Sequence, residues 1–148
     1  MKTIALGSDH AGYELKEYIK AHLTEKGYPV KDYGCYSTER ADYPVYGEKA
    51  ARGVAAGECD LGVLVCGTGC GISLSANRVK GIRCCNCSEP YTAEMSRRHN
   101  NSNMVAVGAR VVGFDLALMI VDRFLEAEFE AGGRHEARVA MIEAIDRS

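Results

Sequence analysis

The residues best suited to chemistry lie at positions 63–78, which read VLVCGTGCGISLSANR. The segment begins as an apolar run typical of a buried strand and continues as a loop. In that loop Gly67, Gly69 and Gly71 lack the Cβ atoms that would keep the backbone away from a ligand. Such a loop presents N–H groups to an anion, and the helix expected after it adds unpaired N–H groups and the positive end of its dipole. Cys66 ends the strand, where these groups favour a thiolate. The pattern predicts a phosphate or oxyanion site beside a reactive thiol.

Cysteine also has a structural interpretation in this chain. Free cysteines are often small buried hydrophobes, so the residue type alone leaves the role of Cys66 open. The chain has seven cysteines, an odd number without secretory context, which favours reduced thiols over a disulfide framework. We expect Cys59, Cys84, Cys85 and Cys87 to be structural. No Cys/His spacing matches a zinc module, so the sequence predicts no metal site.

The order of apolar and amphipathic segments indicates which elements position these residues. Strands are expected at 3–6, 29–33, 61–65, 82–86 and 104–107. Helices are expected around Leu15, Ile19 and Leu23, at 44–56, at 72–78, from an N-cap at Ser88 to His99, at 114–129 and at 134–145. Such alternation predicts an α/β protein, a Rossmann-like three-layer α/β/α sandwich with a parallel sheet of about five strands. At 148 residues the chain is expected to form a single domain, 1–148.

Polar residues follow several of these strands. The strand ends read Ser8-Asp9-His10, Cys66-Gly67-Thr68, Cys87-Ser88-Glu89 and, after the fifth strand, Gly108 and Arg110. Because the carboxyl ends of parallel strands share one edge of the sheet, a carboxylate, an imidazole, a thiol and a hydroxyl can converge there. His99 and Asn100 instead follow a helix, which predicts the opposite edge. A second subunit or a long loop would be needed to bring them to the same site.

Arg134 and Arg138 form a second candidate. They are four residues apart, so a helix would point them the same way and make a fork for a phosphate. An arginine pair with this spacing on a terminal helix is more often a solvated surface. The two glycines that precede the pair favour a binding site.

Composition excludes several classes of protein. The net charge of −2 and the pI near 6.1 give no overall basic field for a nucleic acid. The apolar run at the N-terminus is too short for a signal peptide, and no run approaches the length that spans a membrane. We therefore expect a cytoplasmic protein with no nucleic acid and no membrane among its partners.

A set of motifs in a fixed order resembles a known family. The motifs are GSDHAG, ERADYPVY, CGTGCGISLSANR, GIRCCNCSEPY, SRRHNNSN, VGARVVG and GGRHEAR. Together they resemble the type B ribose-5-phosphate isomerases of the ribose/galactose isomerase family, over almost the whole chain. The resemblance implies interconversion of ribose 5-phosphate and ribulose 5-phosphate through a cis-enediolate, without metal or organic cofactor. It also implies a homodimer or dimer of dimers whose sites are shared between subunits.

The resemblance also implies roles for individual residues. Cys66 matches the general base, His99 the proton donor that helps to open the sugar ring, and Asp9 a partner that handles the sugar hydroxyls. The loop residues that match the anion hole for the enediolate are Gly67, Thr68, Gly69, Cys70 and Gly71. The residues that match the phosphate ligands are His10, Arg110, Arg134 and Arg138, with Asn100 on the sugar.

Two positions depart from the pattern of the family or select a branch of it. One branch has a glutamate base where this chain has Ile72 and lacks the thiol at Cys66, so the resemblance leaves Cys66 as the matching base. Cys70 places a second thiol inside the loop. A disulfide between Cys66 and Cys70 under mild oxidation is a hypothesis.

Three other functions stay open. An allose 6-phosphate or galactose 6-phosphate isomerase of the same family would need a slightly roomier pocket. A nucleotide-binding domain is suggested by the glycine loop after a strand with Glu89 some way on, although G-x-G-x-G is not the usual G-x-G-x-x-G. A redox-sensing protein would use Cys66 and Cys70.

Overall fold

The sheet has five strands, all parallel, as the sequence predicts. The computed structural model describes residues 1–145, so residues 146–148 of the expected domain lie outside the described part. The strands are β1 (Ile4–Ser8), β2 (Val30–Asp32), β3 (Leu61–Cys66), β4 (Cys84–Asn86) and β5 (Met104–Gly108). Their order across the sheet is β2-β1-β3-β5-β4.

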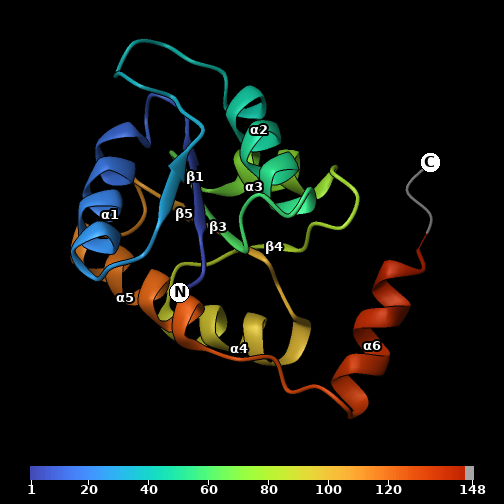
Figure 1. Cartoon of the computed structure of the whole chain (residues 1–148). Coiled ribbons are helices and arrows are strands. Elements are labelled where there is room, and N and C mark those ends of the chain that lie inside the picture. The colour runs from blue at the N-terminus through green and yellow to red at the C-terminus, as the bar shows by residue number, and fades with distance from the viewer. Residues whose placement is uncertain (146–148) are drawn as a thin grey trace.

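Helices cover both faces of this sheet (Figure 1). On one face lie α1 (Tyr13–Glu25), α4 (Pro90–Asn100) and α5 (Phe114–Glu126); on the other lie α2 (Tyr43–Ala55) and α3 (Cys70–Asn77). Successive strand residues point to opposite faces, so Ile4 and Leu6 pack against the first group of helices and Ala5 against the second. Every residue of β3 is buried, which explains its continuous apolar sequence. The three-layer α/β/α prediction is confirmed.

The strand order creates a switch point between β1 and β3. The chain leaves β1 toward β2 on one side, and leaves β3 toward β4 on the other side. The connections that follow these two strands therefore diverge, and a crevice opens beyond their carboxyl ends. Of the polar strand ends expected from the sequence, residues 9, 10 and 66–68 line this crevice.

A buried lysine stabilises the region beside the crevice. The Lys16 side chain on α1 is fully buried, and its Nζ donates to both carboxylate oxygens of Asp32 and to the Cys35 carbonyl, each at 2.7 Å. Burial raises the pKa of the Asp32 carboxyl. Hydrogen bonds from Lys16, the Gly34 amide and Lys20 outweigh burial and hold that pKa below its usual value. This cluster ties α1 to the segment that follows β2.

Some helix limits differ from the sequence predictions. The N-cap of α4 is Glu89 and not Ser88, because the Glu89 carboxylate accepts the Thr92 N–H at 3.0 Å. Helix α5 ends at Glu126, before the predicted limit of Phe129, and Ala127 after it has an extended backbone. Among residues 1–145, no helix has both the length and the apolar character needed to cross a bilayer.

The last helix, α6 (Arg134–Glu143), stands apart from the sheet (Figure 1). Its N-terminal end lies near the end of α4, and Val139 is its one buried residue. Met141 is 70% exposed, and Ile142 and Ile145 are also exposed. An amphipathic helix usually covers such residues by packing, so α6 presents an apolar face to the outside of the chain.

Candidate active site

A cavity of about 440 Å³ lies at the switch point between β1 and β3. It brings together residues that follow three strands with the loop before α2. Its lining is Asp9, His10, Ala11, Arg40, Ala41, Asp42, Tyr43, Cys66, Gly67, Thr68, Gly71 and Arg110. Seven residues expected at the site from the sequence therefore line one cavity of the single chain, and Gly69 and Cys70 belong to the same loop.

The Cys66 thiol is held by the loop that follows it. Its Sγ accepts the Gly69 N–H at 3.1 Å, and the residue is 4% exposed. The Thr68 hydroxyl accepts the Cys70 N–H at 3.2 Å, and Cys70 is the first residue of α3. Side chains of the loop thus accept two of its own N–H groups, and the positive end of the dipole of α3 lies beside the cavity, where it favours a bound anion.

Two glycines of the loop are required by its geometry. Gly69 has φ +83°, and a Cβ there would collide with the Asn86 side chain and the Val107 backbone. A Cβ at Gly71 would meet the ring of Tyr43 at 2.5 Å. Any larger residue at either position would displace the loop from the thiol or narrow the cavity.

Asp9 and His10 are fixed by backbone contacts. Asp9 is 6% exposed, and its Oδ1 accepts the Gly12 N–H at 3.0 Å. His10 Nδ1 lies 3.1 Å from both the N and the O atoms of Ala41. When Nδ1 accepts the Ala41 N–H, the ring proton is on Nε2, which can then donate to an anion. The pair thus offers a carboxylate and an imidazole in defined orientations.

The cavity also holds two arginines, one of which the sequence predictions missed. Arg110 follows β5, and its guanidinium lies 3.5 Å from the point where a Cβ on Gly67 would sit. Arg40, from the loop before α2, and Tyr43, the first residue of α2, also line the cavity and were not assigned a role. Their position in the sequence could have indicated a role, because the segment joins the carboxyl end of β2 to the start of α2.

Besides Gly69 and Cys70, which only adjoin the cavity, four predicted residues lie away from it. His99 and Asn100 end α4, and Arg134 and Arg138 lie on α6, so they occupy the opposite edge of the sheet that the sequence predicts for His99. Asn100 instead lines a separate hollow of about 320 Å³ that includes Ile142 of α6. The single chain therefore separates the predicted site residues into two groups.

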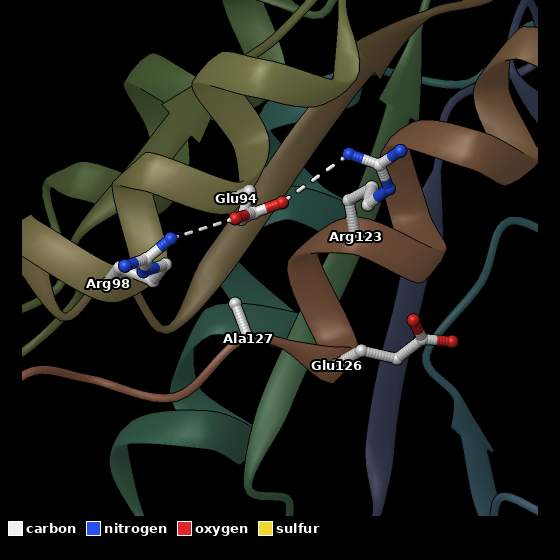
Figure 2. A pocket seen from close by; sticks show the side chains of 5 residues that line it. All are labelled: Glu94, Arg98, Arg123, Glu126 and Ala127. Carbon is white, nitrogen blue, oxygen red and sulfur yellow. Dashed lines mark hydrogen bonds and ion pairs between the residues drawn. The ribbon is translucent and has the colours of Figure 1, made fainter.

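A third hollow, of about 230 Å³, lies between α4 and α5 and contains none of the predicted residues (Figure 2). Glu94 lies between two arginines there, 3.1 Å from Arg98 and 3.4 Å from Arg123. Partly exposed ion pairs of this kind contribute little free energy. We assign this hollow a structural role.

The other thiols differ from Cys66 in their surroundings. Burial raises the pKa of Cys84 well above its usual value, and burial with nearby negative charge raises that of Cys87 to about 12. Both are expected to stay protonated and unreactive. Cys66 and Cys70 are free thiols in the structure, and Cys70 Sγ accepts the Asn86 amide N–H at 3.2 Å.

The fold and the cavity together define a class of protein. A doubly wound α/β sheet holds a thiol, a carboxylate and an N–H loop at its switch point, an arrangement that binds a small anionic ligand and can move protons on it. Comparison with known proteins is more specific. The sequence profile of the ribose/galactose isomerase family matches residues 4–142, and the chain belongs to this family.

Individual relatives agree with that assignment. The chain is 55% identical over 147 residues to ribose-5-phosphate isomerase B of Escherichia coli (strain K12), covering 99% of this chain and 98% of that protein. It is 46% identical to galactose-6-phosphate isomerase subunit LacB of Clostridium acetobutylicum, covering 96% of this chain and 82% of that protein. The solved structure of Clostridium thermocellum ribose-5-phosphate isomerase B superposes with a TM-score of 0.93 at 53% identity, covering 95% of each chain.

Proposed function

We propose that this protein interconverts ribose 5-phosphate and ribulose 5-phosphate through a cis-enediolate, without a metal or organic cofactor. The observation that carries the proposal is the convergence of Cys66, Asp9 and the loop N–H groups in one cavity. The close relatives named above support the choice of this reaction within the family. We also propose that residues 1–148 act as one isomerase domain in the cytoplasm.

In this mechanism Cys66 is the general base that moves a proton between C2 and C1 of the open sugar. The reaction builds negative charge on an oxygen, which the backbone of Gly67, Thr68 and Gly71 in the cavity lining, together with the Thr68 hydroxyl, would stabilise. Asp9 handles the neighbouring hydroxyl protons. Its carboxylate is pre-oriented by the Gly12 amide, which lowers the cost of reaching the transition state.

The phosphate end of the substrate requires positive charge. His10 and Arg110 line the cavity and are placed to bind the phosphate. Arg40 adds a third side chain that can donate hydrogen bonds to it. Binding energy from a phosphate remote from the reacting carbons fixes those carbons beside Cys66.

We further propose a homodimer, or a dimer of dimers, in which His99, Asn100, Arg134 and Arg138 complete the cavity of a second copy. Two observations support this. These residues lie away from the cavity of their own chain, and α6 presents exposed apolar residues that a second copy would cover. In such an assembly His99 would protonate the ring oxygen to open the sugar, and the arginines would bind its phosphate.

A hexose 6-phosphate is the alternative substrate within the family, as galactose 6-phosphate or allose 6-phosphate. The 46% identity to a galactose-6-phosphate isomerase subunit supports a hexose 6-phosphate as the alternative substrate. Both reactions use the same proton transfer, so the discriminating property is the size of the cavity around Arg40 and Tyr43.

Proton NMR in heavy water tests the reaction. Reduced protein incubated with ribose 5-phosphate, without added metal or nucleotide, should yield ribulose 5-phosphate carrying solvent deuterium. Conversion of allose or galactose 6-phosphate at a higher kcat/KM would move the assignment to the alternative substrate. Failure to convert any of these sugars, beside a working control isomerase, would reject the isomerase and favour a nucleotide-binding or redox-sensing domain.

Mixing subunits tests the shared site. Cys66→Ala and His99→Asn chains are each expected to be inactive, but a mixed dimer would hold one site with both residues intact. Random pairing should then restore about a quarter of the wild-type activity. If each chain used its own His99, the mixture would stay inactive.

A further inference from the structure

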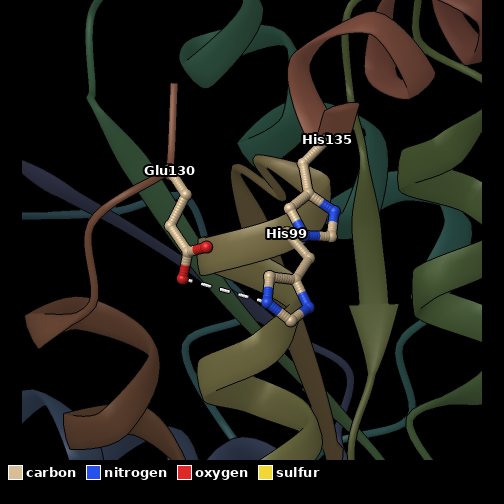
Figure 3. A group of neighbouring side chains, drawn as sticks. All are labelled: His99, Glu130 and His135. Atoms are coloured by element: carbon tan, nitrogen blue, oxygen red, sulfur yellow. Dashed lines mark ion pairs between the residues drawn. The ribbon is translucent and has the colours of Figure 1, made fainter. Parts of the chain in front are cut away.

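His99, Glu130 and His135 form a cluster of metal-type ligands outside the cavity (Figure 3). The side chains come from the end of α4, the segment before α6 and the first turn of α6. Their donor atoms all lie within 4.8 Å of one another. The two imidazole rings stack at a centroid distance of 4.0 Å, and His99 Nε2 lies 3.8 Å from Glu130 Oε2.

We propose that these three residues bind a divalent transition-metal ion such as Zn²⁺, and that the bound ion inhibits the isomerase by occupying His99. Two imidazoles and a carboxylate are a ligand set that Zn²⁺ accepts, with a fourth position left for water. The inhibitory part rests on the function proposed above, since it requires His99 to deliver a proton.

The placement of the two histidines suits this role. The ring of His135 stacks on the ring of His99, so one nitrogen of each ring can reach the same ion after a small rotation. Both histidines are partly exposed in the single chain, so an ion can reach them from solvent.

Metal binding requires a small rearrangement. Two ligands of a tetrahedral zinc ion lie roughly 3.4 Å apart, so the donors must close by about an ångström. The rings are almost parallel, at 7°, and must turn about χ2 so that their lone pairs converge. These are partly exposed side chains, one of them on the first turn of a loosely packed helix, which makes such a rotation inexpensive.

Neighbouring cations oppose the ion and limit its affinity. Arg98 pairs with Glu130 Oε2 at 2.8 Å, and Arg134 and Arg138 lie on the same helix as His135. Arg98 also contacts Glu94 at 3.1 Å, so it keeps a partner when the metal takes Glu130. The site should thus bind Zn²⁺ reversibly, as an inhibitor does, and not as a permanent structural metal.

The binding experiment uses untagged, reduced, full-length protein titrated with Zn²⁺ by calorimetry, with Co²⁺ absorption to identify the ligands. We expect His135→Ala to weaken Zn²⁺ binding by about tenfold or more, and His22→Gln, a histidine paired with Asp122 elsewhere, to leave it unchanged. Equal affinity in His135→Ala would overturn the site. Thiolate charge-transfer bands with Co²⁺ would also overturn it, because they would place the metal on cysteine.

The inhibition experiment compares the wild-type and His135→Ala proteins. Zn²⁺ should lower the turnover of the wild type, and His135→Ala should need about tenfold more Zn²⁺ for the same loss. Equal sensitivity of the two proteins, or full turnover by zinc-loaded wild type, would overturn the inhibitory role. A protein that binds Zn²⁺ as expected but converts no sugar phosphate would reject the proposed isomerase while supporting the metal site.

Discussion

The cavity at the carboxyl edge of the sheet and helix α6 are built in opposite ways. Around the cavity, Cys66 and Asp9 are almost fully buried, and backbone N–H groups from their own loops hold both side chains. On α6, the side chains of Arg134 and Arg138 are exposed and make no hydrogen bond or ion pair within residues 1–145. Contacts within one chain hold the side chains of the first region, whereas the two arginines offer charge that no partner among the described residues holds.

The difference shows which part of a site one chain can preorganise. A base and an oxyanion hole need accuracy, which buried loops and backbone contacts supply. Phosphate ligands tolerate looser placement before binding, because charge attracts the anion over a longer distance. Changes at Cys66, Asp9 and the loops that hold them should therefore affect turnover or folding, and changes on α6 should affect affinity.

The largest effect is expected from Cys66→Ala. Removal of the general base should lower the rate of deuterium incorporation by about 10²–10⁴-fold, while calorimetry should still detect binding of ribose 5-phosphate. Cys84→Ala is the matched control, because Cys84 is a buried strand cysteine away from the cavity. It should lose some stability and keep its turnover. Equal turnover in Cys66→Ala would contradict the division between the two regions.

The next effect is on folding. Lys16→Met should lower the free energy of unfolding by about 3–5 kcal/mol, because it leaves the Asp32 carboxylate, which is 10% exposed, without its main partner. Lys20→Met is the control, since Lys20 contacts the same carboxylate at 3.0 Å but is 39% exposed. It should cost less than about 1 kcal/mol. Similar losses in urea unfolding of the two variants would show that burial of Lys16 is unimportant.

Acid should reveal the same interaction. Because the folded pKa of Asp32 lies below its usual value, its contribution to stability is complete above about pH 4 and is lost as the pH falls through the folded pKa. Unfolding free energies measured from pH 6 downward should thus fall less steeply in Asp32→Asn than in the wild type. Parallel curves would argue against this assignment.

Gly69→Ala should have a moderate effect. The residue has φ +83° and a Cβ would meet Asn86 and Val107, so the loop should shift and lose its contact with Cys66. We expect a loss of about 1–3 kcal/mol in stability together with reduced turnover. Gly81→Ala isolates the backbone cost, because Gly81 has φ +90° with open space around it. A Gly69→Ala protein no worse than Gly81→Ala would show that the close contacts are relieved without cost.

The smallest effect is expected on α6. Arg138→Ala should raise KM for ribose 5-phosphate by about tenfold, since one charge-assisted contact to phosphate is lost, and should leave kcat and thermal stability nearly unchanged. Arg123→Ala, an exposed arginine in the hollow of Figure 2, should leave both kinetic constants unchanged. A fall in kcat without a change in KM would place Arg138 in the chemistry instead.

The sequence predicted the sheet, and the residues that meet in the cavity, for physical reasons. Strand ends are marked by apolar runs that stop at polar residues, and Cys66, Asp9 and Arg110 follow such runs, so topology brings them together. Arg40 was missed because the segment between β2 and α2 has no periodicity to place it. The Ser88 cap was misplaced by one residue, because a carboxylate caps as well as a hydroxyl and Glu89 precedes the proline. The position of His99 at the end of a helix, away from the cavity, was predicted, but whether it completes the cavity of a second copy is a matter of assembly and stays a proposal.

The strand order also affects how the chain folds during its synthesis. The central strand β3 pairs with β1 on one side and with β5 on the other, and β5 begins at Met104. The part of the sheet that holds Cys66 is therefore incomplete until most of the polypeptide has left the ribosome. Until then one edge of the fully apolar β3 has no neighbour, so nascent chains stalled before β5 are the ones expected to require chaperones.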